Sequence, residues 1–252
     1  MTRLIHLSDL PELHPLLDDE NLAQIEGFDL NAPLSVLHDS QQTMVLSPKE
    51  NKRVVIKISK YPMTVSPDQE YDLVNKFHRA HSSLFTCPNA IIFSIPHQYL
   101  AMSRLNKPLS LTKKVETLTD DEAQKIGHAF GSFSVEADKG GLVHTDFHLG
   151  NVTEEKEGKI GILDFSALVK TNIERMLASP IMTNERLAFS IAKTFCEGTG
   201  KRFKLSSLKT EGMYLLAKVH NNPGFTKETI ARHETVFHNF MKRAKAYPRY
   251  FR

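Results

Sequence analysis

Two short apolar runs, each ending in an aspartate, limit what this chain can fold into more than any other feature. The first leads into His144-Thr145-Asp146, with Asn151 five positions after the aspartate, and the second leads into Asp164, thirteen positions after Asn151. Carboxylate and amide oxygens are ligands that Mg²⁺ prefers, and a carboxylate can accept the proton of an attacking hydroxyl. The pattern therefore predicts a metal-assisted phosphoryl-transfer site, in which Asp146 meets the hydroxyl and Asn151 and Asp164 bind the metal.

Each of these residues also has an ordinary structural explanation. Asp146 and Asn151 could be turn residues and Asp164 could cap a strand, because Asp and Asn are common in both places. A three-residue His-x-Asp motif is weak by itself. The full pattern His-x-Asp-x4-Asn-x12-Asp-Phe is far more specific, and it resembles the catalytic and metal-binding loops of the protein-kinase-like superfamily.

The resemblance implies an α+β class and a bilobal protein-kinase-like fold, with ATP and Mg²⁺ as cofactors. The N-lobe, residues 1–105, should hold an N-terminal extension, a small antiparallel sheet of five strands and one helix. The C-lobe, residues 106–252, should be reduced, mainly helical, and carry the catalytic and metal-binding loops. Runs of β-branched and apolar residues between turn residues mark the five strands, at residues 34–37, 43–46, 53–58, 90–95 and 98–102.

Lys57 is the informative residue of the third strand. A lysine in a β-branched run can simply extend its charge to solvent from an edge strand. The sequence Val54–Lys57, however, resembles the kinase strand whose lysine contacts the α- and β-phosphates of the nucleotide. Glu70, in a helix with Ser66 as its N-cap, is then the expected ion-pair partner. Asp72 is the alternative partner, and the helix dipole alone would also favour Glu70 in the first turn.

The phosphate-covering loop departs from the family. Kinases usually carry Gly-x-Gly-x-x-Gly between their first two strands, whereas residues 39–42 here read Asp-Ser-Gln-Gln. Gly27 lies too early in the chain for this role. Because a backbone without glycine approaches phosphates less easily, the side chains of Ser40, Gln41 or Gln42 are the expected substitutes.

The exit of the fifth strand resembles the interlobe hinge of the family. The resemblance implies that backbone groups near Ser103 and Leu105 bind adenine and that Met102 lies behind it. Any strand that runs into a loop has a similar sequence, so this assignment depends on the resemblance alone.

Three helices are expected in the C-lobe. Thr119 begins a capping box ahead of apolar residues at helical spacing, and further helices are expected over residues 184–196 and 226–246. Ser166 stands where many kinases have glycine, and Thr145 replaces the arginine through which a phosphorylated activation loop controls many protein kinases. We therefore expect no control by activation-loop phosphorylation.

His148 bears on the identity of the acceptor. Protein kinases commonly carry a lysine two positions after the catalytic aspartate. Here the sequence Asp146–Asn151, of the form Asp-x-His-x-Gly-Asn, instead resembles the loop of aminoglycoside and choline phosphotransferases. His148 is expected either to contact the γ-phosphate in catalysis or to brace the loop.

The short stretch of chain after Ser166 indicates another branch. Small-molecule phosphotransferases usually add a helical insert that walls the acceptor pocket, whereas minimal bacterial effector protein kinases lack much of the second lobe. This economy favours a Ser/Thr protein kinase whose substrate is a protein, including one of a host cell. A small-molecule O-phosphotransferase and a pseudokinase-like binding module without chemistry are the alternatives.

The composition argues against several other classes. A net charge of +3 over 252 residues is too small to indicate nucleic-acid binding. Cys87 and Cys196 are far apart and lack Cys-x-x-Cys spacing, so neither a disulfide scaffold nor a zinc site is expected. No apolar run is long enough to span a bilayer. We expect a soluble protein that stays in the bacterial cytoplasm or enters a host cell without a Sec-type signal peptide.

Overall fold

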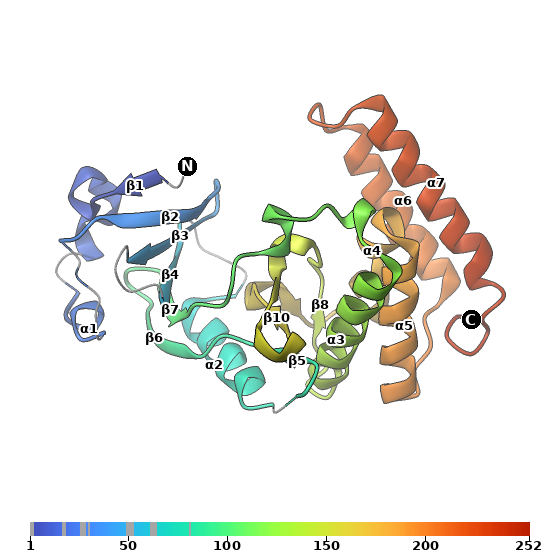
Figure 1. The fold of residues 1–252 in the computed structure, drawn as a ribbon, viewed down its shortest axis with the longest axis horizontal. Coiled ribbons are helices and arrows are strands. Elements are labelled where there is room, and N and C mark those ends of the chain that lie inside the picture. Colours follow the sequence, from blue (N-terminus) through green and yellow to red (C-terminus); the bar gives the residue numbers. More distant parts are fainter. Residues whose placement is uncertain are drawn as a thin grey trace. The chain divides into compact units, whose positions relative to one another are not determined.

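The chain forms two compact units that differ in secondary structure (Figure 1). The first comprises Met1–Ala80 and Cys87–Leu105, and the second comprises His81–Thr86 and Asn106–Arg252. The predicted α+β class is confirmed, with an antiparallel sheet in the first unit and mostly helices in the second. The computed structural model describes residues 3–16, 19–25, 29, 31–48, 53–60, 65–80 and 82–252.

Within the described residues, the sheet of the first unit has six strands, one more than predicted. Its order is β1-β2-β3-β4-β7-β6, and all neighbouring strands are antiparallel. The additional strand β1 pairs with β2 at one edge of the sheet. Three residues, of which only Ile5 is buried, are too few to show an alternating pattern. The strands are β1 (Arg3–Ile5), β2 (Leu34–Asp39), β3 (Thr43–Pro48), β4 (Val54–Ser59), β6 (Ala90–Ser94) and β7 (Tyr99–Ser103).

The N-terminal extension covers one face of this sheet. Its side chains share a buried apolar cluster with Ile56 and Ile58 of the central strand β4. Successive strand residues point to opposite faces, so Lys57 lies on the other side of the sheet. The helical segments of the extension are short, with 3₁₀ helices at Leu7–Asp9 and Pro11–Leu16 and the helix α1 at Glu20–Ala23.

The helix α2 (Pro67–His78) packs against the sheet through β6 and β7. Its predicted start is confirmed, because Ser66 precedes the helix and donates its backbone N–H to Oε1 of Gln69 at 3.2 Å. Val74 and Phe77 are buried. The sheet is therefore covered on both faces, by the extension on one and by α2 on the other.

Short strands in the second unit frame the predicted catalytic and metal-binding loops. The strand β10 pairs antiparallel with β9 and parallel with β5, which places residues 81–86 in this unit. The strand β8 pairs with β11. These strands are β5 (Phe85–Thr86), β8 (Val143–His144), β9 (Val152–Glu154), β10 (Ile160–Ile162) and β11 (Leu168–Val169).

Five helices of the described chain belong to the second unit, and the sequence predicted three of them. They are α3 (Asp120–Asp138), α4 (Pro180–Thr183), α5 (Glu185–Thr199), α6 (Leu205–His220) and α7 (Lys227–Ala244). The predictions of α3, α5 and α7 are confirmed, whereas α4 and α6 were missed. Figure 1 shows α6 and α7 side by side. Among the described residues, no helix combines the length and the apolar character needed to cross a bilayer.

Close packing of α3 against α5 holds the centre of the second unit. A Cβ placed on Gly127 of α3 would lie 2.5 Å from the Cβ of Ser190 on α5, so only glycine allows this approach. The next turn of α3 carries Phe130, whose ring lies 4.2 Å from that of Phe147 between centroids. One face of α3 therefore packs on α5, and aromatic side chains of the same helix reach the catalytic loop.

Candidate active site

A hydrogen-bonded loop joins β8 to β9. Its first residue, Thr145, donates its N–H to the carbonyl of Ala167 at 3.0 Å. At its end, Asn151 donates its N–H to the carbonyl of His148, and Leu163 donates to the carbonyl of Asn151, both at 2.9 Å. Backbone bonds thus fix both ends of the loop, so its side chains project from a defined frame.

His148 orients Asp146 within this loop. Its Nε2 lies 3.4 Å from Oδ2 of Asp146, and its Nδ1 accepts the N–H of Gly150 at 3.0 Å. The pairing with His148 lowers the pKa of Asp146, against the raising effects of burial and of the Asp164 charge. Asp146 is therefore ionised at neutral pH, as a proton acceptor must be.

Two neighbours act in opposite directions on the charge of His148. The Asp146 carboxylate raises the pKa of His148, and burial opposes it. The Gly150 N–H that points at Nδ1 favours the neutral ring, because a nitrogen that accepts this bond carries no proton. The neutral form with its proton on Nε2 satisfies both contacts.

Asn151 and Asp164 present oxygen atoms from two different segments. Asn151 donates Nδ2 to the carbonyl of Asp146 at 2.9 Å, which directs Oδ1 of the same amide away from that carbonyl. Asp164 has φ 59° and ψ 68°, in the left-handed region that Asp tolerates better than most residues. Ser166 donates its hydroxyl to Oδ1 of Asp164 at 2.5 Å. Backbone strain of this kind concentrates at functional sites.

These groups fit a magnesium ion. Mg²⁺ is usually held by one or two carboxylates together with phosphate oxygens and water, which matches the oxygens of Asp164 and Asn151. The charge of Asp164 also raises the pKa of Asp146, so the two carboxylates repel each other and a cation would relieve the repulsion. No group of three His, Cys, Asp or Glu side chains that could hold a metal occurs among the residues that the structure describes.

His144 joins the two segments, a role that the motif alone did not reveal. Its Nε2 lies 3.2 Å from the carbonyl of Leu163, directly before Asp164. Burial lowers the pKa of His144, so the ring is neutral and Nε2 donates its proton to that carbonyl. The rings of Phe130 and Phe133 contact the imidazole edge-on, at 5.5 and 6.1 Å between centroids. The only sequence signal for this role is the first position of the His-x-Asp motif.

Lys57 and Glu70 form a buried ion pair in the first unit. The Nζ atom of Lys57 lies 2.8 Å from Oε1 and 3.1 Å from Oε2 of Glu70. Only 11% of the lysine side chain and 6% of the glutamate side chain are exposed. Asp72, the alternative partner, is exposed on the same helix. The structure thus pairs Lys57 with Glu70, the partner that the sequence favoured over Asp72. The contact of this pair with a nucleotide stays a prediction.

The loop between β2 and β3 closes on itself. The hydroxyl of Ser40 accepts the N–H groups of Gln42 and Thr43 at 3.2 and 3.0 Å, and lies 3.1 Å from the carbonyl of Thr43. The turn thus uses the Ser40 hydroxyl, whereas the exposed side chains of Gln41 and Gln42 have no hydrogen bond to the described part of the chain. Contact of either side chain with a phosphate stays a prediction. Gly27 lies outside the described residues.

Lys60 braces this loop, although the sequence did not single it out. Its Nζ bonds Oδ1 of Asp39 at 2.5 Å and the carbonyl of Ser40 at 2.8 Å, and its N–H donates to the carbonyl of Gln42 at 2.8 Å. The pairing with Lys60 lowers the pKa of Asp39. A lysine from the end of β4 therefore fastens a turn that contains no glycine.

The predicted adenine-binding segment lies at the end of β7. The N–H of Ser103 donates to the carbonyl of Asn89 at 2.8 Å, so this donor already has a partner. The backbone of Leu105 has no hydrogen bond within the part of the chain that the structure describes. Met102 is buried. Of the two backbone positions predicted to bind adenine, Leu105 is the one with groups to offer.

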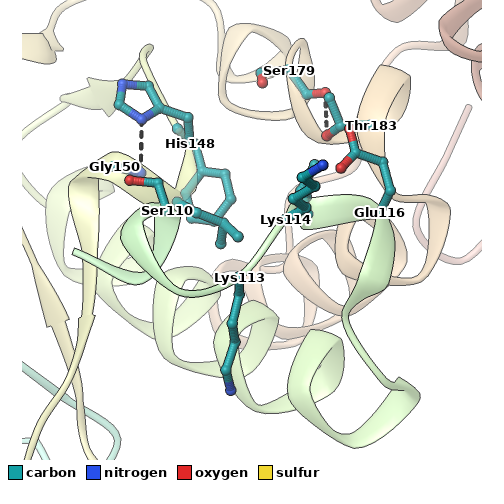
Figure 2. A pocket seen from close by; sticks show the side chains of 11 residues that line it. Ser110, Lys113, Lys114, Glu116, His148, Gly150, Ser179 and Thr183 are labelled. Carbon is teal, nitrogen blue, oxygen red and sulfur yellow. Dashed lines mark hydrogen bonds between the residues drawn. The ribbon is translucent and has the colours of Figure 1, made fainter. Parts of the chain in front are cut away.

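A cavity of about 350 Å³ opens beside the catalytic loop, within the second unit (Figure 2). Residues 147–150 of the catalytic loop form one wall of the cavity. The segment of residues 113–116, ahead of α3, forms another, and Ser179 and Thr183 close it from α4 and the residue before it. His148 thus contacts Asp146 and is also one of the residues that line a space that a ligand can enter.

Comparisons with known proteins give limited information. No protein-family model matches the chain, and no curated protein matches it. Many solved structures share similarity with it. One is the complex of Rv3197 with erythromycin from Mycobacterium tuberculosis, with 16% identity and a TM-score of 0.43, covering 64% of this chain. The match covers 53% of that protein, so the chain spans about half its length. A similarity of this size does not show that this chain shares the fold or the ligand of that protein.

Proposed function

We propose that the protein transfers the γ-phosphate of ATP to a hydroxyl group in a magnesium-dependent reaction. The observation that carries the proposal is the arrangement around Asp146. Its carboxylate is ionised and oriented by His148, and its backbone carbonyl holds the amide of Asn151. One short loop thus combines a proton acceptor with an oriented oxygen ligand.

The residues of the second unit would act directly on the reaction. Asp146 accepts the proton of the acceptor hydroxyl, and Asn151 and Asp164 hold the metal through oxygen atoms. Bound Mg²⁺ neutralises charge on the phosphate oxygens. His144 and Ser166 act only as positioning residues, because they contact the segment of Asp164.

The residues of the first unit would bind the nucleotide. Lys57, aligned by Glu70, contacts the α- and β-phosphates. The backbone of Leu105 binds adenine, with Met102 behind the base, and Gln41 covers the phosphates. A buried lysine with both carboxylate oxygens in reach supports this assignment, because its charge is held in one direction.

Two classes of acceptor follow from this site. The cavity beside His148 favours a small molecule, because its volume of about 350 Å³ exceeds what one serine side chain fills. Small-molecule sites span roughly 300–1,000 Å³. The second candidate is a Ser or Thr of a protein, including a host protein, which the resemblance to minimal bacterial effector kinases favours.

Incubation with γ-labelled ATP and Mg²⁺ tests the proposal. Wild-type protein and Asp146→Ala are compared on a panel of hydroxylated small molecules and on a eukaryotic lysate. Label in the small molecules with wild type alone supports the first acceptor class, and label in one or a few protein bands supports the second. Intact nucleotide binding without any transfer would contradict the proposal and indicate a binding module.

A further inference from the structure

The cavity beside the catalytic loop is lined by both apolar and polar side chains. Phe147, Leu149 and Val115 supply apolar surface, and three hydroxyl side chains line the same space. The hydroxyl of Thr183 donates to the carbonyl of Ser179 at 3.0 Å, which leaves its oxygen able to accept a further bond. The lining residues are Ser110, Lys113, Lys114, Val115, Glu116, Phe147, His148, Leu149, Gly150, Ser179 and Thr183.

Most charged groups around this cavity already have a partner. The Nζ of Lys113 lies 2.5 Å from Oε1 of Glu122, outside the cavity lining. Glu116 accepts a hydrogen bond from Nη2 of Arg232 at 2.6 Å. His148 faces Asp146. The first two pairs each join a charged group of the lining to an opposite charge and contribute little net charge to the cavity.

Lys114 is the exception. Within the described chain, its ammonium group has no hydrogen bond or ion pair, although the side chain lines the cavity. Figure 2 shows Lys113 and Lys114 pointing in opposite directions, with Lys114 directed toward Glu116 and Thr183. Lys114 is exposed, so its ammonium group offers the cavity a solvent-accessible positive charge that no described residue pairs, next to hydroxyl groups and apolar side chains.

We propose that this cavity is the acceptor site and takes a small hydroxylated molecule that carries an anionic group, with Lys114 as its anchor. The proposal rests on the transferase function proposed above and names its substrate class. A lysine ammonium binds carboxylate or phosphate through charge-assisted hydrogen bonds, the stronger class of such bonds. The same charge repels cationic acceptors such as choline, although the catalytic loop resembles that of choline phosphotransferases.

The position of the cavity suits the reaction. The lining includes Phe147 and His148, which follow Asp146 directly in the chain, and His148 lies 3.4 Å from the Asp146 carboxylate, so the cavity opens next to the residue proposed as the proton acceptor. In the transfer, the hydroxyl oxygen forms a bond to the γ-phosphorus, and the bond from that phosphorus to the β–γ bridging oxygen breaks. The electron pair stays on ADP, and the hydroxyl proton passes to Asp146.

Binding measurements test the anchor without turnover. Calorimetry on the full chain compares glycerol 3-phosphate and glycerate with neutral glycerol, for wild type, Lys114→Met and Lys113→Met. Lys113→Met is the matched control, because it removes the neighbouring ammonium, which is already paired with Glu122. Wild type and Lys113→Met should bind the anions better than glycerol, and Lys114→Met should weaken anion binding by about tenfold or more.

Two outcomes would overturn this inference. One is that Lys114→Met binds the anions as tightly as wild type, and the other is that neither anion binds better than glycerol. Transfer assays on wild type, beside these titrations, separate the two proposals. If Lys114-dependent anion binding is found while wild type transfers no label, the anion site stands but the transferase proposal, and with it the role as acceptor site, fails. If label enters only proteins and no anion binds, the transferase stands and the anionic acceptor is excluded.

Discussion

The imidazole of His148 faces the carboxylate of Asp146, with Nε2 3.4 Å from Oδ2. Its other nitrogen accepts the N–H of Gly150, so the ring is tied to the loop backbone on one side and to the carboxylate on the other. Because both nitrogens are engaged, the ring has one orientation. Its contact with Oδ2 then fixes the orientation of the Asp146 carboxylate.

Removal of this ring should change the pH dependence of the proposed reaction. His148 lowers the pKa of Asp146 in wild type, so His148→Ala lets that pKa rise. Because Asp146 acts in its ionised form, the acidic limb of kcat/KM should move to higher pH in the variant. The maximal rate should fall by about 10- to 100-fold, within the usual range for proton-transfer groups. An unchanged acidic limb would show that His148 does not act through Asp146.

Ser166→Ala should weaken magnesium-dependent nucleotide binding. The Ser166 hydroxyl donates to Oδ1 of Asp164, and loss of a group that orients a metal ligand typically lowers metal affinity by about 10- to 100-fold. The measurement is the Mg²⁺ concentration at which ATP raises the thermal midpoint half-maximally. Ser179→Ala, another hydroxyl of the same unit, serves as the control. Equal Mg²⁺ requirements in the two variants would show that the Ser166 hydroxyl does not orient a metal ligand.

The buried pair of Lys57 and Glu70 should behave non-additively. Lys57→Met leaves the Glu70 carboxylate buried without its lysine partner, which costs about 3–5 kcal/mol in the free energy of unfolding. The double variant, which adds Glu70→Leu, removes both charges, so it should be more stable than Lys57→Met alone. Urea unfolding of all four proteins measures this cycle. If the losses in the free energy of unfolding of the two single variants simply add in the double variant, the two charges do not stabilise each other.

His144 should make the protein sensitive to acid. Burial lowers its pKa in the folded state, so below an ordinary histidine pKa of about 6.5 the unfolded chain binds more protons. The free energy of unfolding should therefore decrease as the pH falls below that value. His144→Gln keeps a donor for the Leu163 carbonyl but cannot titrate, so its stability should decrease less steeply. The control is His38→Gln on the exposed part of β2. A slope equal to wild type in His144→Gln would contradict the prediction.

Local patterns were sufficient where a structural unit is contiguous in the chain. Runs of β-branched and apolar residues between turn residues predicted β2, β3, β4, β6 and β7, and the cap at Ser66 predicted the start of α2. The spacing of Asp146, Asn151 and Asp164 pointed to one site, and the structure gathers these residues around a single loop.

Tertiary packing decided what the local patterns missed. Gly212 lies in the middle of α6 and lowers its intrinsic helix propensity, but the ring of Phe237 on α7 packs over this glycine and requires its small size. Similarly, Glu116 and Arg232 are separated by 116 residues, so no window of sequence shows that they pair. Lys114 could be singled out only from the structure, because only the structure shows that the charged groups beside it are already paired.

The covering of the sheet on both faces has a mechanical consequence for Lys57. Side chains of the N-terminal extension pack against Ile56 and Ile58, which are the direct neighbours of Lys57 along β4. Any event that loosens the first 25 residues, such as proteolysis or capture by another protein, would release one of the two surfaces that hold this strand. The amino-terminal segment can therefore influence the position of Lys57 from the opposite face of the sheet, through the apolar neighbours of that residue.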